Sequence, residues 1–315
     1  MTTFTKRWFH SLPFCPVALL ILVPLYLPDA NAAPQQRAGS SEYPLVGMPA
    51  TVTLLSGGAE PRTRLRYAVP RDYRAQVSQS INSESQVSMD GDALPATPTV
   101  AMTKRVEVAV TDASKPGQVT CAIVFTGFST TGGRGAAKNE ADYNSISGTI
   151  TLDDRGVNRA TRFDLSKTSN AQLGQLMANS WADISTPLPD EPIGVGARWE
   201  VKNTIHTDAI QALQKTEYEL LAFDGKVLTV KASVVQTAVA QRMANPLMPS
   251  GSDAQLKKYS GVGNSTITVH LDSLVPATES TLTSTMVVEV SAAGMTMEVR
   301  TETTVRVSMA RMKSS

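Results

Sequence analysis

The chain has 315 residues, with 29 basic and 28 acidic side chains and a formal net charge of +1. A balanced charge gives no global field that would attract nucleic acid or an anionic membrane surface, although local patches remain possible, and we expect no nucleic-acid partner. Of the two cysteines, only Cys121 lies beyond the first 32 residues. That part of the chain is therefore not expected to form an intramolecular disulfide.

The first 32 residues have the pattern of a secretion signal. Lys6 and Arg7 form a basic start, the apolar stretch is densest over 17–27, and Ala30-Asn31-Ala32 is a small-x-small cleavage site. Prolines interrupt the apolar stretch, whereas a membrane span needs about 20 apolar residues. We therefore expect residues 1–32 to be a cleaved signal peptide that leaves no stable membrane span. The protein is expected to be extracytoplasmic, either periplasmic or secreted.

Residues 33–50 contain Pro, Gly and Ser with little periodicity, which predicts a flexible leader. Apolar and polar residues then alternate in long runs separated by turn signals, which is typical of β-strands. Strands are expected early in this region, at 51–55 and 63–69. We expect residues 51–315 to form a single large antiparallel β domain, with two β lobes joined near 169–199 as the alternative.

The C-terminal hairpin is the clearest structural signal. Its last strand alternates, with Met297 and Val299 among the residues on one face and charged residues on the other. Thr301 and Thr303 interrupt the apolar face, which fits either a kink or a roomy, partly wet interior. A 15-residue strand would span roughly 50 Å, and strands this long must twist and coil. The sequence thus predicts a mainly β fold, a large curved antiparallel sheet or half-barrel of long strands.

One amphipathic helix is expected in the middle of the chain, packed on this sheet. Ser169 or Asn170 can cap its start, and Pro187 ends it. Its apolar stripe has helical spacing and consists of Leu173, Leu176, Met177, Trp181 and Ile184. Such a stripe normally packs on a sheet, with a lid or a partner surface as the alternative. Further along, residues 240–261 contain Pro and Gly and are expected to form an excursion loop.

The catalytic inventory is small. Beyond the signal, the histidines are His206 and His270, and the adjacent carboxylates at 153–154 and 190–191 lie beside Gly or Pro, where turn chemistry explains them. Nucleophile-elbow and zinc-binding motifs are missing from the sequence. We therefore expect no enzyme, no catalytic residue, no cofactor and no metal site. Cys121 shares a strand face with apolar residues, which favours a buried thiol over a reactive thiol or an intermolecular bridge.

The segment Pro189–Trp199 reads Pro-Asp-Glu-Pro-Ile-Gly-Val-Gly-Ala-Arg-Trp. It resembles the Pro-x-x-Pro-Val-x-Val-Gly-x-x-Trp element of an uncharacterised family of bacterial secreted β-rich proteins. The resemblance implies an envelope or secreted protein and supplies no activity and no catalytic residue. Physically, the prolines favour an extended run, Gly196 permits a tight turn, and Trp199 is expected to anchor the next strand in the core.

Two functional classes follow from a curved sheet with apolar, methionine-containing faces. The first is a non-enzymatic protein that binds a lipid or a small hydrophobic ligand in a β cleft. The second is a structural or protein-interaction component of the bacterial envelope, whose partner would be an envelope protein. An extracytoplasmic hydrolase is a distant third. Candidate residues for the ligand cleft or a helical lid are Leu173, Leu176, Met177, Trp181, Met286 and Met297.

Overall fold

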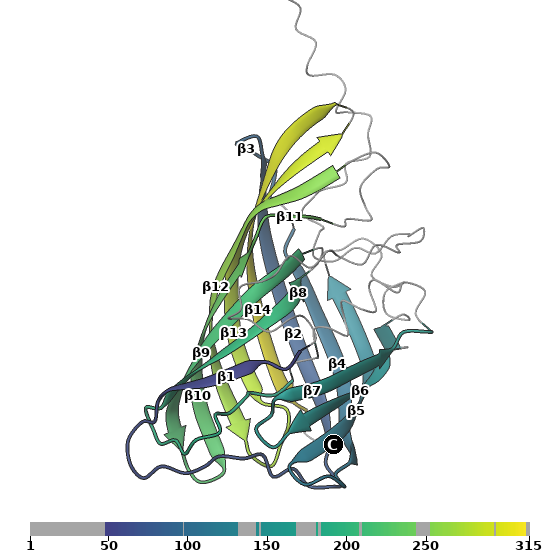
Figure 1. The fold of residues 1–315 in the computed structure, drawn as a ribbon. Helices are drawn as coiled ribbons and strands as arrows, with labels where there is room; N and C mark the ends of the chain where they lie inside the picture. The colour runs from purple at the N-terminus through teal and green to yellow at the C-terminus, as the bar shows by residue number, and fades with distance from the viewer. Residues whose placement is uncertain are drawn as a thin grey trace, which may run out of the picture.

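The computed structural model describes residues 48–96, 98–131, 143–144, 146–167, 181, 184–207, 210–243, 253–292 and 294–312. Within these ranges, fourteen strands join one large antiparallel sheet (Figure 1). The strand order is β1-β8-β9-β10-β12-β13-β14-β2-β4-β5-β6-β7, with β11 beside β12 and β3 beside β2. The two edge strands β1 and β7 do not pair, so the sheet is not closed into a barrel. The expected mainly β, antiparallel architecture is confirmed.

The strands are long over most of the sheet. In chain order they are β1 Thr51–Ser56, β2 Arg74–Met89, β3 Asp92–Ala93, β4 Val100–Asp112, β5 Gln118–Thr131, β6 Ser147–Asp153 and β7 Asn158–Asp164. The second half contains β8 Arg198–Thr207, β9 Ile210–Phe223, β10 Val227–Ala238, β11 Gln241–Arg242, β12 Asp253–His270, β13 Ala277–Ala292 and β14 Met295–Arg311. The 18 residues of β12 would reach about 60 Å at 3.3 Å per residue, so the strand must coil.

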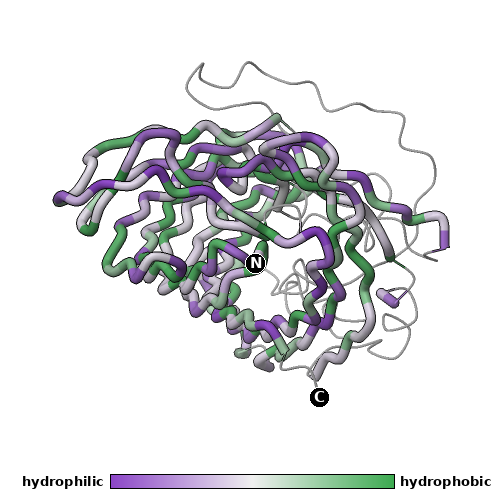
Figure 2. Tube along the Cα trace, turned by 90° about the horizontal axis from the view of Figure 1, so that it is seen from below, coloured by the Kyte–Doolittle hydropathy of each residue, from purple (hydrophilic) through white to green (hydrophobic). Residues whose placement is uncertain are grey.

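The sheet curves around its own inner face, as the view from below in Figure 2 shows. Gly263 in β12 helps the strands to approach closely where they coil. A Cβ atom at this position would lie 2.6 Å from the carbonyl oxygen of Thr281 in β13, which is too close for any other residue. The coiling of the longest strands therefore depends on a glycine in the strand interior.

Two hairpin turns of the sheet contain the residue types that tight turns require. Asp224 and Gly225 connect β9 to β10, with Oδ1 of Asp224 accepting hydrogen bonds from the N–H groups of Lys226 at 3.1 Å and Val227 at 2.8 Å. Gly225 has a φ of 97°, which an L-residue rarely adopts. Gly294, with a φ of 79°, lies in the turn between β13 and β14, where Ala292 pairs with Met295. Local turn chemistry thus sets the register of these hairpins.

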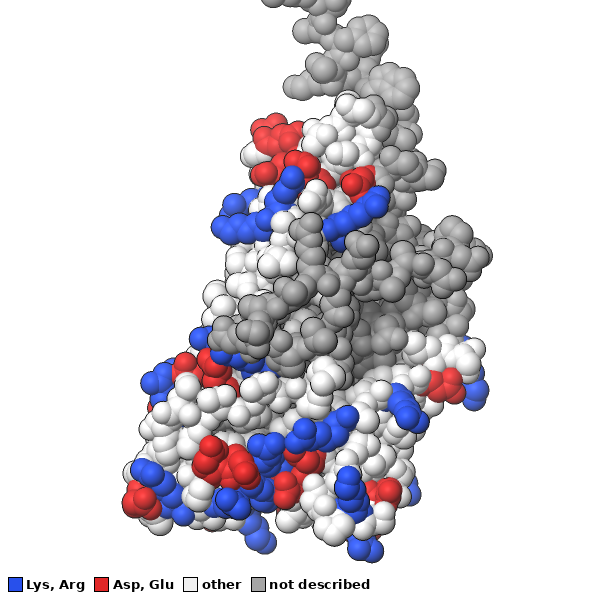
Figure 3. All heavy atoms as spheres, in the orientation of Figure 1, with Lys and Arg blue, Asp and Glu red and all other residues white. Residues whose placement is uncertain are grey.

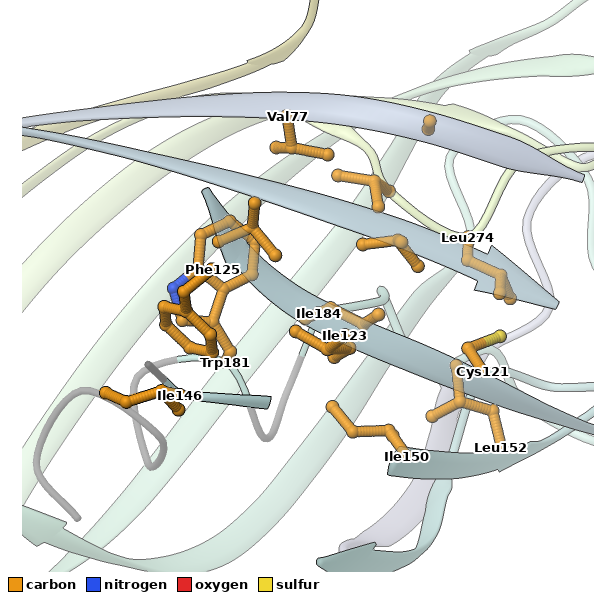
Figure 4. Packing of buried hydrophobic residues seen from close by; sticks show 14 of the residues in the cluster. Val77, Cys121, Ile123, Phe125, Ile146, Ile150, Leu152, Trp181, Ile184 and Leu274 are labelled. Atoms are coloured by element: carbon orange, nitrogen blue, oxygen red, sulfur yellow. The ribbon is translucent and has the colours of Figure 1, made fainter. Parts of the chain in front are cut away.

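Three clusters of buried apolar side chains lie on the inner face. The β2–β6 core includes Val106, Ile123 and Phe125, and Trp181 and Ile184 pack into it (Figure 4). The β8–β12 core is built around Trp199, Leu220, Leu228, Val230 and Ile193. The third core lies near the start of β12 and the end of β13. Its members are Ile210, Ala212, Met243, Ala254, Leu256, Tyr259 and Val288.

The two halves of the sheet are bridged at one end by irregular segments. The Tyr67 hydroxyl donates to the carbonyl oxygen of Thr186 at 3.0 Å, and the Tyr67 N–H donates to the carbonyl of Asp154 at 2.7 Å. The Leu188 N–H donates to the carbonyl oxygen of Arg155 at 2.9 Å. The contacts join residues before β2 and before β8 to the β6–β7 turn. We call this network the base of the sheet.

The base corrects one prediction. Residues 63–69 alternate as a strand would, with Leu65 and Tyr67 buried, but apart from a bridge between Thr63 and Ile193 they belong to no strand. Their backbone groups bond to loops of the base instead. The loop expected over 240–261 is also shorter, because β12 already begins at Asp253.

The described residues do not contain the expected central helix, and Trp181 and Ile184 of its predicted stripe are not helical. Leu173, Leu176 and Met177 lie outside the described residues, as do the signal peptide and most of the leader. In the described ranges the structure has no helical element comparable to the predicted one. Within the Pro189–Trp199 segment, Gly196 adopts a φ of 81° and Trp199 is fully buried, so both expected structural roles are confirmed.

Candidate ligand-binding surface

The inner face of β13 and β14 carries apolar side chains that are not fully buried. Cross-strand pairing places Val288 opposite Val299, and both are buried, which identifies the face that points inward. Six further apolar residues on the same face of these two strands are half-buried. They are Leu282, Met286 and Val290 of β13 and Met297, Val305 and Val307 of β14, which we call the inner patch.

The inner patch contrasts with the packed cores on the same face. Side chains such as Val106, Ile123 and Trp199 have essentially no exposed surface. If other side chains covered the inner face completely, Leu282 and Val305 would be as buried as these core residues, because they face the same way. Half-buried apolar residues on the inner face leave contact area that another apolar group can cover.

A row of polar and short side chains crosses the sheet through the inner patch. Register pairs connect Gln214 of β9, Gln236 of β10, Gly261 of β12, Ser284 of β13, Thr303 of β14 and Ser85 of β2 in one line, which we call the polar row. All of these residues lie on the inner face, because directly paired residues share a face. Ser284 falls between Leu282 and Met286 of the inner patch.

The polar row is hydrogen-bonded within itself. Nε2 of Gln236 donates to Oε1 of Gln214 at 2.7 Å, and the Tyr259 hydroxyl donates to Oε1 of Gln236 at 2.7 Å. The hydroxyls of Ser85 and Thr303 lie 3.1 Å apart. Gln236 and Thr303 are both buried. Of the two threonines that interrupt the apolar face of β14, Thr303 therefore belongs to the polar row, whereas Thr301 lies between Met286 and Val87.

A buried lysine lies on the same inner face, in β4. Lys104 is 3% exposed, and its cross-strand neighbours are Gln79 of β2 and Phe128 of β5. Burial disfavours its charged form and lowers the pKa of its ammonium group to about 8. Sequence reasoning missed this residue, although its position two residues before Val106 places it on the inward face of the strand.

The structure distributes the predicted cleft residues over two places. Met286 and Met297 lie on the inner face of neighbouring strands and belong to the inner patch. Trp181 instead packs in the β2–β6 core, with its ring centroid 6.1 Å from that of Phe125. Sequence reasoning also missed the polar row. Its signal in the sequence was that Gly261 and Gly263, two residues apart, fall on the inward-facing side of β12.

The cysteine is buried as expected. Cys121 has no exposed surface and lies among apolar residues of the β2–β6 core, on the same strand face as Ile123 and Phe125 (Figure 4). Burial raises the pKa of its thiol to about 12. The thiolate, which is the reactive form, is thus strongly disfavoured in the folded protein.

The outer face carries charges of both signs. Arg306 pairs with Glu84 at 2.9 Å across β14 and β2, and Lys202 pairs with Glu200 at 3.0 Å in β8. Basic and acidic side chains also alternate on the face seen in Figure 3. Among the described residues, three or more His, Cys, Asp or Glu side chains do not come together in a group that could hold a metal ion. The described part of the chain contains no helix that is long and apolar enough to cross a membrane.

Comparisons with known proteins add little. No family model matches the chain, and no curated protein matches it. A solved structure described as "Asymmetric conductivity of engineered proteins" aligns at 10% sequence identity over 75% of this chain and 100% of that chain, with a TM-score of 0.23. A TM-score this low does not establish a shared fold.

Proposed function

We propose that this chain is an exported, non-enzymatic binding protein that holds a lipid or another hydrophobic ligand against the inner face of its curved sheet. The observation that carries the proposal is the inner patch, whose apolar side chains face inward and yet remain half-buried. Covering apolar surface contributes roughly 25 cal/mol per Å², so a long alkyl chain placed there would gain substantial binding free energy. The predicted signal peptide would deliver the protein to the periplasm or the exterior.

The polar row suits a ligand that is not purely hydrocarbon. Ligand sites usually combine apolar walls with a few polar groups that fix the orientation of the bound molecule. The hydroxyls of Ser284 and Thr303 lie beside the inner patch and can offer such groups. The inner face therefore favours an amphipathic ligand, with its alkyl part on the inner patch.

We include the central helix in this proposal as a lid. Its apolar stripe over Leu173–Ile184 would cover a bound alkyl chain from the side opposite the sheet. Support for this arrangement comes from the sequence pattern and from Trp181, which already packs against the inner face.

The direct test is to purify the mature chain from its native envelope, record its mass by native mass spectrometry and then extract bound lipids. A stoichiometric lipid or small hydrophobe would support the proposal and identify the class of ligand. A clean mass of the protein alone, with no lipid recovered, would contradict it. That result would favour the alternative of a structural or protein-interaction component of the envelope.

A further inference from the structure

The polar row divides the inner patch into two apolar halves. The half toward the β13–β14 turn consists of Met286, Val290 and Met297, and the half toward the start of β13 consists of Leu282, Val305 and Val307. The residues of both halves are half-buried. A ligand that lies across the polar row can therefore cover apolar surface with each of its two ends.

Two hydroxyl groups at the boundary between these halves are available to a ligand. Ser284 belongs to the polar row, and Thr301 of β14 lies opposite Met286, the next inward-facing residue of β13. Within the described part of the chain neither hydroxyl makes a hydrogen bond, whereas the hydroxyls of Thr303 and Ser85 bond to each other. Thr301 is only 8% exposed. Buried polar groups normally have a partner, so a polar group of a ligand is a suitable one.

The register of the strands places the two hydroxyls close enough to act together. Ser284 pairs with Thr303, so Thr301 is its diagonal neighbour on the adjacent strand. Diagonal neighbours in an antiparallel pair lie about 7–8 Å apart. On the other side of Ser284 the directly paired residue is Gly261, which has no side chain to cover the hydroxyl. A group of the size of an ester or an amide can therefore reach both hydroxyls at once.

The chemistry of the polar row selects an uncharged polar group. Its hydroxyls and amides donate and accept hydrogen bonds but carry no charge. The nearest charged side chain on the inner face of the described strands is Lys104, which pairs with Gln79. Gln79 lies six residues along β2 from Ser85 of the polar row, which is about 20 Å at 3.3 Å per residue. A charged group at Ser284 would therefore lose its hydration without gaining a counter-charge, which is costly.

Resting on the proposed function, we propose that the ligand is an uncharged amphiphile with an ester or amide group between two alkyl chains. The polar group binds to the hydroxyls of Ser284 and Thr301, and each alkyl chain lies on one half of the inner patch. Val307 pairs with Ser280, so the patch extends along β13 from Ser280 to Val290. That length is about 33 Å at 3.3 Å per residue, which leaves room for an alkyl chain on each side of the polar row.

The test compares octyl nonanoate, methyl palmitate and palmitate in equilibrium binding to the delipidated chain. The two esters are isomers that differ only in the position of the ester group. Octyl nonanoate is expected to bind about threefold or more tightly than methyl palmitate, because its central ester reaches the hydroxyls while both alkyl chains contact the patch. Palmitate is expected to bind about tenfold or more weakly than methyl palmitate, because its carboxylate is charged. Methyl palmitate binding as tightly as octyl nonanoate, or palmitate binding as tightly as methyl palmitate, would overturn the proposal.

Variants assign the preference to the two hydroxyls. Ser284→Ala and Thr301→Val should each weaken the binding of octyl nonanoate about three- to tenfold, the worth of one neutral hydrogen bond. Ser233→Ala, at an exposed position of β10, is the matched control and should leave the affinity unchanged. Ser284→Ala removes no hydrogen bond within the described residues and should unfold at the wild-type urea concentration, so the test stays decisive if Thr301→Val fails to fold. An unchanged affinity of Ser284→Ala for octyl nonanoate would contradict the assigned site.

The outcomes separate this inference from the proposed function. If all three ligands bind with equal affinity and Ser284→Ala changes nothing, the chain binds lipid but the assigned class of ligand is wrong. If none of the three ligands binds to the delipidated wild-type chain, both the class of ligand and the lipid-binding function are contradicted.

Discussion

The Tyr259 hydroxyl donates a hydrogen bond of 2.7 Å to Oε1 of Gln236, and Nε2 of Gln236 in turn donates to Gln214 at 2.7 Å. These three residues come from β12, β10 and β9, so one amide connects three strands on the inner face. A buried amide between two polar partners holds both of them in fixed positions. Gln236 is therefore the residue that organises this half of the polar row.

Replacing Gln236 by leucine should destabilise the fold. The change leaves the buried Tyr259 hydroxyl without its acceptor and Gln214 without its donor, and each unsatisfied group costs about 1–3 kcal/mol. We expect the free energy of unfolding, measured by urea denaturation, to fall by about that amount. Gln255→Leu, at an exposed position of β12, is the control and should stay within about 0.5 kcal/mol of the wild type. A Gln236→Leu variant as stable as this control would contradict the assigned role.

The base of the sheet can be tested with a pair of glycines. Gly156 and Gly91 have φ values of 78° and 91°, so alanine is strained at both positions, by about 1–2 kcal/mol. At Gly156 the new Cβ atom would also lie 2.6 Å from the Tyr67 ring, whereas at Gly91 nothing lies within 4 Å. Gly156→Ala should therefore lower the thermal midpoint clearly more than Gly91→Ala. Equal losses would show that Tyr67 is not fixed at the base.

The buried lysine predicts a specific dependence of stability on pH. The pKa of Lys104 is about 8 in the folded protein against 10.5 in the unfolded chain. Between these values the unfolded state binds more protons, so the contribution of Lys104 to the free energy of unfolding rises with pH. The full shift corresponds to roughly 3 kcal/mol.

Other groups act in the opposite direction at high pH, so a variant is needed. Burial raises the pKa values of Cys121, Tyr67 and Tyr143, and their contributions to stability decrease as the unfolded chain loses protons. Denaturation of wild type and Lys104→Met between about pH 7 and about pH 9.5 isolates the lysine. The free energy of unfolding of the wild type should increase relative to that of Lys104→Met as pH rises. A constant difference would contradict the depressed pKa.

Cys121 provides a simple probe of the core. Because the thiol is buried and its pKa is raised to about 12, it should not react with a thiol reagent such as 5,5′-dithiobis(2-nitrobenzoate) in the native protein. Complete reaction is expected in denaturant. Rapid labelling under native conditions would show that the β2–β6 core opens far more readily than its packing implies.

Much of the sheet follows from local sequence patterns, whereas the contacts at its base and the polar row do not. The hairpins at Asp224–Gly225 and near Gly294 are predictable because turn chemistry acts between neighbours. Residues 63–69 alternate like a strand, but their partners at the base lie more than a hundred residues away along the chain, as Tyr67 and Thr186 show. The polar row arises from the register of six strands, which single-strand periodicity cannot supply. The sequence did contain a signal for Lys104, because this charged residue lies two positions before Val106 and therefore on the same, inward-facing side of the strand.

The most direct measurement of the central claim is the lipid affinity of two tryptophan variants of β13. Ser284→Trp would place a large ring on the inner face between Leu282 and Met286, whereas Thr283→Trp would place it on the exposed face of the same strand. The account predicts that Ser284→Trp weakens palmitate and methyl palmitate alike, by about tenfold or more, and that Thr283→Trp binds both as the wild type does. Unchanged affinity of the Ser284→Trp variant for both ligands would contradict binding at the inner face.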